Sequence, residues 1–130
     1  MTAAHVSADP RYHPEVVRRM RELPNAGCAP DAATWIVATA GDEVQGALIE
    51  VSLDVRGERV HAAKFRAYGC PHVIASASWL AEHLVGRTRD EVEAWDWRDV
   101  QRALDVPPAK FGRLLTLQDV ARALAGNWPA

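Results

Sequence analysis

Cysteine is scarce in this chain of 130 residues, which contains only Cys28 and Cys70. Two cysteines do not make a disulfide framework, so the sequence excludes the class of small disulfide-stapled secreted domains. Long apolar runs are also missing, and no charged segment leads into an apolar one at the start. We therefore expect no membrane span, no secretory signal and a cytoplasmic protein whose two thiols are reduced.

An excess of charge of one sign is missing as well. The 15 Lys and Arg residues nearly balance the 17 Asp and Glu residues, and the five Trp residues are not interleaved with a basic patch. Attraction to nucleic acid or to an anionic membrane surface is therefore not expected. The residue spacing fits no zinc finger, phosphate loop or dinucleotide fingerprint. What is present is ordinary globular composition, 48% apolar and 25% charged, in a length that suits one domain.

The hydrophobic periodicity predicts an α+β fold with an N-terminal helix, a three-stranded antiparallel sheet and C-terminal helices on one sheet face. Residues 1–11 are unpatterned, so we expect a disordered tail before a single domain at 12–130. The alternation of apolar and polar residues predicts three strands, over residues 34–40, 43–55 and 59–68. Gly41-Asp42 breaks the first strand from the second, and a hairpin turn at 56–58 joins the second to the third. His61 falls on the apolar face of the third strand. Helical spacing and caps predict helices over residues 13–23, 73–84, a short one from 88, 96–104 and 114–126.

Cys70 is the sharpest chemical feature, because it lies between a strand-like and a helix-like run in "KFRAYGCPHVIASASW" (residues 64–79). Free N–H groups at a helix N-terminus favour a thiolate, which is the form that binds metal or attacks electrophiles. The alternative is a small buried hydrophobe. A thiol enzyme with Cys70 as nucleophile and His72 as base is disfavoured, since residues two apart on a helix point to different faces.

Three further residues have a functional and a structural interpretation. Asp42 is either a carboxylate directed into a site or a turn residue that bonds its own backbone. His72 is either a metal ligand or a half-exposed histidine of a first helical turn. Cys28, on the loop over residues 23–33, either turns toward Cys70 or fills a surface crevice. Cysteine, aspartate and histidine are all competent ligands for zinc or iron.

The segment "VPPAK", which comprises Val106, Pro107, Pro108, Ala109 and Lys110, is a second candidate. Two consecutive prolines preorganise an extended conformation, so a groove in a partner can bind it at low entropic cost. The alternative is a plain connector between helices.

Together these segments resemble the iron–sulfur cluster assembly scaffold family of the IscU and NifU N-terminal domain type. The resemblance runs over residues 12–124. Its most specific parts are "AAKFRAYGCPHVIASASWLAEHLVGRTRDEV" (residues 62–92) and "LDVPPAKF" (residues 104–111), and "NAG" (25–27) and "AGDEV" (40–44) also fall in the expected places. The resemblance implies the family fold, with "VPPAK" similar to the segment that a dedicated Hsp70-type chaperone holds.

The resemblance also implies a ligand set, which this chain retains only in part. Members of the family hold a nascent cluster with three cysteines and an aspartate. The aspartate and the second cysteine correspond to Asp42 and Cys70. The first cysteine corresponds to Ala40, the third to Arg113, and the histidine before the third to Gly112. Because clusters are normally held by four thiolates, we expect an altered site. Arg113 would repel a metal cation there, or pair with Asp42.

The resemblance therefore implies a non-enzymatic, scaffold-like protein that binds iron or an iron–sulfur cluster transiently at Cys70 and Asp42, with Cys28 and His72 as further ligands. A single zinc ion, or no metal, is the alternative content of the site. The alternative function is a metal-free paralogue that acts as an interaction module. The implied partners are a cysteine desulfurase and an Hsp70-type chaperone, and we expect a monomer or a weak dimer.

Overall fold

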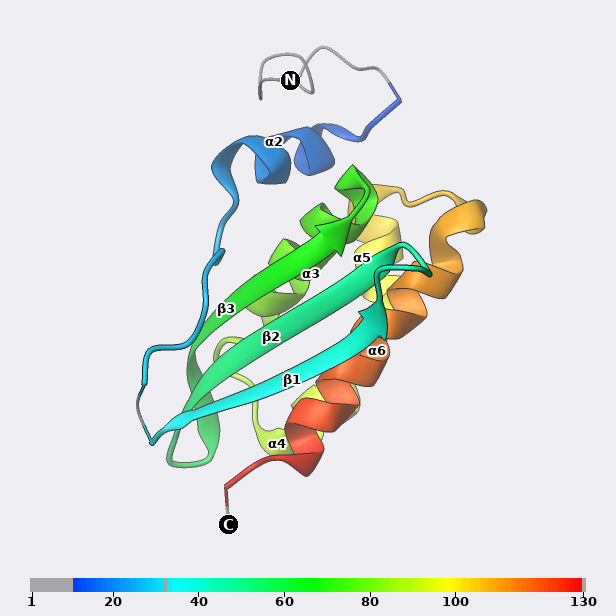
Figure 1. The fold of residues 1–130 in the computed structure, drawn as a ribbon. Coiled ribbons are helices and arrows are strands. Elements are labelled where there is room, and N and C mark those ends of the chain that lie inside the picture. Colours follow the sequence, from blue (N-terminus) through cyan, green and yellow to red (C-terminus); the bar gives the residue numbers. More distant parts are fainter. Residues whose placement is uncertain (1–10, 32, 130) are drawn as a thin grey trace.

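The computed structural model describes residues 11–31 and 33–129, so most of the predicted tail lies outside the described residues. Figure 1 shows the chain as one sheet with helices behind it. The elements in chain order are α2 (Pro14–Glu22), β1 (Trp35–Asp42), β2 (Ala47–Arg56), β3 (Arg59–Gly69), α3 (Pro71–Leu84), α4 (Arg89–Glu93), α5 (Trp97–Leu104), the 3-10 turn η1 (Pro108–Lys110) and α6 (Phe111–Gly126).

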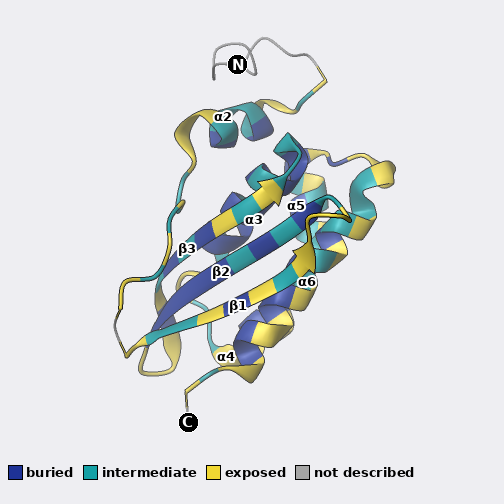
Figure 2. Cartoon of the chain, in the orientation of Figure 1, coloured by how far each residue is buried: buried dark blue, intermediate teal, exposed yellow. Residues whose placement is uncertain are grey.

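The three strands form an antiparallel sheet in the order β1-β2-β3, with α3 and α6 against one face (Figure 1). Ile49, Val51 and Leu53 alternate along the central strand and are fully buried beneath these helices (Figure 2). The predicted α+β architecture is confirmed. Among the described residues, no helix is long and apolar enough to cross a membrane.

The first hairpin differs from the sequence prediction. β1 does not break at Gly41 but continues to Asp42, and the turn follows at residues 43–46. Gly41 adopts a φ of +85°, and a Cβ built on it would lie 2.0 Å from the carbonyl oxygen of Ala47. Glycine is therefore required at position 41, because the two strands of the hairpin approach closely there. In the sequence this glycine indicates a strand break instead.

The second hairpin contains a register shift that changes which side chains are buried. The β2–β3 pairing shifts between Asp54 and Val55. Val60 is consequently buried, while His61, predicted on the apolar face, is exposed. A bulge adds one residue to one strand and inverts the alternation on either side of it. The prediction for His61 was therefore wrong, whereas Ala63 and Phe65 lie in the core as expected.

The helices that follow the sheet begin largely where their caps predict. Thr88 and Glu91 exchange both hydrogen bonds of a capping box at the start of α4. The carboxylate of Asp96 accepts the backbone N–H of Arg98 at the start of α5. α6 begins at Phe111, earlier than predicted, because the 3-10 turn leads directly into it.

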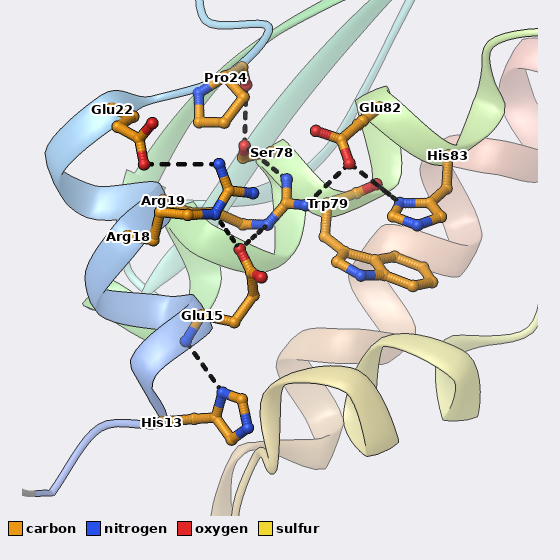
Figure 3. A network of polar contacts seen from close by, with 10 residues as sticks. All are labelled: His13, Glu15, Arg18, Arg19, Glu22, Pro24, Ser78, Trp79, Glu82 and His83. Carbon is orange, nitrogen blue, oxygen red and sulfur yellow. Dashed lines mark hydrogen bonds and ion pairs between the residues drawn. The ribbon is translucent and has the colours of Figure 1, made fainter.

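α2 lies against α3 through a buried guanidinium (Figure 3). Arg19 is 2% exposed, and its side chain donates to the hydroxyl of Ser78 at 3.1 Å and to the carboxylate of Glu82 at 3.0 Å. Ser78 in turn donates to the carbonyl oxygen of Pro24 at 2.8 Å. Arg19 lies one helical turn after the buried Val16, so it faces the core side of α2. The first helix is thus fixed by polar bonds as well as by apolar contact.

Candidate functional site

Cys70 caps the N-terminus of α3 directly after β3, as the sequence predicts. It has φ −72° and ψ 170°, and its side chain makes no capping hydrogen bond. Its carbonyl oxygen accepts the first helical N–H, from Ile74, at 3.1 Å. The side chain is a free, half-buried thiol that packs partly against the core. Cys70 is therefore neither fully enclosed nor fully exposed.

Close packing at the end of the sheet requires a glycine at position 69, directly before Cys70. Gly69 has φ +155°, and a Cβ on it would lie 2.8 Å from the side chain of Val73 and 2.9 Å from the carbonyl oxygen of Gly46. The strand thus passes directly against both the first turn of α3 and the β1–β2 turn. Any side chain at position 69 would push these two elements apart, and with them Cys70.

Asp42 lies at the same end of the sheet as Cys70, two strands away. Asp42 pairs with Ala47, and Ala47 pairs with Gly69. With neighbouring strands about 4.8 Å apart, the backbones of Asp42 and Gly69 are about 10 Å apart. Asp42 is exposed, and its Oδ1 accepts the backbone N–H of Gln45 at 2.8 Å. This bond is the one expected of a turn residue, and it occupies one carboxylate oxygen.

Arg113, which the resemblance assigns to the position of the third family cysteine, extends from the first turn of α6 to the β1–β2 turn. A Cβ on Gly46 would lie 3.1 Å from Nη2 of Arg113, so the guanidinium lies directly against this glycine. Both Asp42 and Arg113 are among the described residues, and no ion pair joins them. The structure therefore places a fixed positive charge beside the turn that follows Asp42.

His72 lies in the first turn of α3. It is 8% exposed, and its ring lies 5.0 Å from the ring of Tyr12. Burial lowers the pKa of His72 below its ordinary value of 6.5, and Lys110 lowers the pKa further, whereas Asp105 opposes the shift. The imidazole is thus held neutral at neutral pH, and it is more deeply buried than the sequence predicts.

Cys28 lies beside the middle of β3. Ala26 forms a parallel bridge with Phe65, and the N–H of Gly27 donates to the carbonyl oxygen of Phe65 at 2.9 Å. Cys28 follows as an exposed thiol. Phe65 and Cys70 are five residues apart on an extended strand, which corresponds to about 16 Å. Within residues 11–31 and 33–129, no three His, Cys, Asp or Glu side chains gather as a metal-ligand set.

The segment at residues 106–110 combines a buried anchor with exposed prolines. Val106 is 1% exposed, and its carbonyl oxygen accepts a hydrogen bond from the side chain of Gln101 at 3.2 Å. Pro107 has extended backbone angles, φ −69° and ψ 153°, as the sequence predicts, but Pro108 begins a 3-10 turn. Pro107, Pro108 and Ala109 are exposed. The preorganised part is therefore an extended residue followed by a tight turn.

Sequence reasoning did not anticipate the surroundings of His72. The nearby charges, Lys110 and Asp105, lie more than thirty positions further along the chain. Nothing in the local pattern around residue 72 indicates them. His72 lies one and two helical turns before the buried Ser76 and Leu80, and this helical spacing was the available sequence signal that it faces inward.

A strand–Gly-Cys–helix hinge lies at one end of a three-stranded antiparallel sheet that helices cover on one face, and this arrangement defines an α+β domain. The NifU-like N-terminal domain family matches residues 11–129 of this chain. This chain belongs to that family. The family is that of the iron–sulfur cluster assembly scaffolds. The order of the motifs in the sequence indicates the same family.

Relatives support the same assignment. The chain is 26% identical over 125 residues to the mitochondrial iron sulfur cluster assembly protein 1 of Kluyveromyces lactis, with 92% of this chain and 68% of that protein covered. It is 34% identical over 122 residues to the bifunctional protein NifU/MnmA of Rubrobacter xylanophilus, of which it spans 25% while 91% of this chain is covered. The Escherichia coli scaffold protein IscU is 29% identical over 84 residues, with 64% of this chain and 66% of IscU covered.

A solved structure supports the fold. The putative iron–sulfur cluster assembly scaffold protein for the SUF system from Fervidobacterium islandicum superposes with a TM-score of 0.67 at 15% identity. The superposition covers 88% of this chain and 96% of that one.

Proposed function

We propose that this chain serves iron–sulfur cluster assembly as an interaction module that engages the assembly machinery without holding a cluster by itself. The observation that carries the proposal is the guanidinium of Arg113 against Gly46, at the position of a family cysteine. A fixed positive charge repels a metal cation and supplies no electron pair to it. Because a cluster normally needs four thiolate ligands, one thiol and one carboxylate at the family positions do not suffice.

The segment at residues 106–110 is accessible for such a role. Pro107, Pro108 and Ala109 are exposed, while the buried Val106 fixes their position on the domain. An exposed segment with restricted backbone freedom loses little entropy when a partner binds it. We infer that an Hsp70-type chaperone binds this segment and that the desulfurase is a further partner.

A second candidate function is transient binding of iron, or of a cluster as cargo, at Cys70 and Asp42. It is favoured by the placement of both residues at one end of the sheet through the Asp42–Ala47 and Ala47–Gly69 pairs. Among the described residues no third His, Cys, Asp or Glu side chain joins them as a metal-ligand set, so the remaining ligands would come from outside this chain. The two candidates differ in one measurable property, which is the metal content of the protein.

Anaerobic reconstitution with iron and sulfide separates the two candidates. Wild type and Cys70→Ser are compared by visible absorption and Mössbauer spectroscopy. The interaction module predicts a colourless wild type that matches the variant. A coloured, iron-containing wild type beside a colourless Cys70→Ser variant would reject the module and support the second candidate.

Binding to a purified Hsp70-type chaperone tests the role of the segment at residues 106–110. A Pro107→Ser/Pro108→Ser variant keeps the buried Val106 anchor, so we expect a folded protein with about tenfold weaker chaperone binding. Pro30→Ser, at another exposed proline, is the matched control and should bind as wild type does. Fluorescence anisotropy of labelled protein gives the affinities. Equal affinity for all three proteins would remove the support for this role.

A further inference from the structure

An open apolar groove runs between α2, the loop that follows it, β3 and α3. Its volume is about 360 Å³, and its apolar walls are formed by Met20, Leu23, Phe65, Ala67 and Ile74. In Figure 1 the segment after α2 descends beside β3, which borders the groove. Leu23 is 40% exposed, so one wall of the groove is open to solvent.

The floor of the groove is an incompletely paired strand edge. β3 is an edge strand of the sheet, and its outward edge is paired only in part. The N–H of Phe65 donates to the carbonyl oxygen of Asn25 at 2.9 Å, and the carbonyl oxygen of Phe65 accepts from Gly27 at 2.9 Å. Residues 25–27 thus already bond to the edge of β3 through one isolated parallel bridge, Ala26–Phe65.

The next outward-facing residue of that edge has no such partner. Backbone groups alternate in direction along a paired strand, so Ala67 points outward as Phe65 does. Within the part of the chain that the structure describes, neither the N–H nor the carbonyl oxygen of Ala67 has a backbone partner across this edge. The N–H and the carbonyl oxygen of Ala67 are a donor and an acceptor with the spacing of a β-ladder, and they lie on the floor of an apolar groove. The ligand that suits such a site is an extended polypeptide.

The charge beside the groove is already neutralised. Arg66 lies at its rim, and Glu50 accepts two hydrogen bonds from the guanidinium, at 2.6 Å and 3.0 Å. This pairing raises the pKa of Arg66. An occupant therefore needs no acidic residue to match the rim, and its binding should depend little on salt.

We propose that the groove receives an extended segment of another polypeptide, which continues the edge pairing of residues 25–27 along β3 to Ala67. Its backbone exchanges hydrogen bonds with Ala67, and one apolar side chain packs between Leu23 and Ile74. The added strand ends three residues before Cys70, so a bound partner lies next to the strand–helix hinge. The proposal involves neither metal nor the prolines at residues 107 and 108, and it stands apart from the function proposed above.

Nuclear magnetic resonance of the full, ¹⁵N-labelled chain tests the proposal. The probe is the peptide acetyl-Thr-Val-Ser-Val-Thr-amide, and the control probe is the same peptide N-methylated at every amide. We expect saturable shifts at Ala67, Leu23 and Ile74, slower solvent exchange of the Ala67 amide, and no response to the methylated peptide.

Two variants locate the site. Ala67→Pro removes the outward N–H, which an edge strand tolerates, and should weaken binding about tenfold beside an Ala67→Ser control. Leu23 has φ +47°, a conformation that asparagine accepts, so Leu23→Asn removes the apolar wall without straining the backbone and should weaken binding roughly threefold. The well-dispersed spectrum of each variant verifies its fold.

Three results would overturn the proposal. The first is the absence of shifts at Ala67, and the second is undiminished binding by both Ala67→Pro and Leu23→Asn. The third is a concentration-dependent shift of Ala67 without peptide, which would make a second copy of this chain the occupant. Unchanged peptide binding by Cys70→Ser is expected, so failure here is distinguishable from failure of the function proposed above.

Discussion

At the scale of single residues, two neighbouring arginines of α2 illustrate how position decides the role of a charge. The side chain of Arg19 is 2% exposed, whereas that of Arg18 is 38% exposed, although both pair with Glu15. Only Arg19 also bonds α3 (Figure 3). A buried guanidinium is tolerable here because its two terminal nitrogens donate hydrogen bonds, and removal of it leaves their acceptors unpaired.

We therefore expect Arg19→Ala to lower the free energy of unfolding by about 2 kcal/mol, since Ser78 and Glu82 lose their donor and a cavity forms. The partial exposure of Glu82 keeps the cost below that of a fully buried pair. Urea denaturation monitored by circular dichroism measures it. Arg18→Ala is the control and should change stability by no more than about 0.5 kcal/mol. Equal costs for both variants would mean that the buried network does not fix α2.

At the scale of elements, the β1–β2 hairpin places one end of the candidate site. Gly41 keeps β1 in contact with β2 at Ala47, and this pairing positions Asp42. The turn that follows receives Arg113 from α6. The geometry of this hairpin thus determines how the carboxylate of Asp42 and the guanidinium of Arg113 are arranged around the β1–β2 turn.

Gly41→Ala should therefore destabilise the protein by about 3 kcal/mol, because the left-handed φ and a Cβ against backbone both add cost. Gly57→Ala is the matched control, since Gly57 has φ +63° but no atom within 4 Å of a built Cβ. It should lose about 1 kcal/mol from the backbone conformation alone. Thermal unfolding of both variants measures the difference. A loss for Gly41→Ala no larger than that for Gly57→Ala would contradict the close approach.

At the scale of the whole molecule, the chain keeps the fold of the scaffold family, while the resemblance implies that Ala40 and Arg113 stand at two of its ligand positions. The sheet, the hinge at Cys70 and the helices do not depend on sulfur ligands for their packing. Their stability comes from the apolar core beneath α3 and α6. A fold that is stable without its site can keep the positions of that site after the ligands are replaced.

Restoring the ligands should therefore restore cluster binding. An Ala40→Cys/Arg113→Cys variant would place two new thiols with Cys70 and Asp42, which is the ligand set that the resemblance implies. After anaerobic addition of iron and sulfide, we expect visible absorption from a bound cluster, because the added thiolates replace the repelling guanidinium. Ala40→Ser/Arg113→Ser, which supplies no thiolate, is the control and should stay colourless. A colourless restored variant would show that these positions do not converge.

Much of this arrangement follows from local sequence signals. The S/T-x-x-E capping box at Thr88 and the Gly-Cys-Pro hinge at Cys70 are encoded within a few residues, so the sequence predicts them correctly. The end of β1 and the exposure of His61 are not local, because they depend on a close approach and a bulge between paired strands. The periodicity of apolar residues in the sequence does not indicate where the register between paired strands shifts.

By itself, the sequence determined the fold class and the position of Cys70 between a strand and a helix, since these depend on residue identity and periodicity. Only the tertiary structure decided that His72 is buried beside Tyr12 and that Cys28 follows a segment bridged to β3. These outcomes depend on which distant segments pack together. Packing is set by the burial of the whole core, and no single stretch of the chain contains that information.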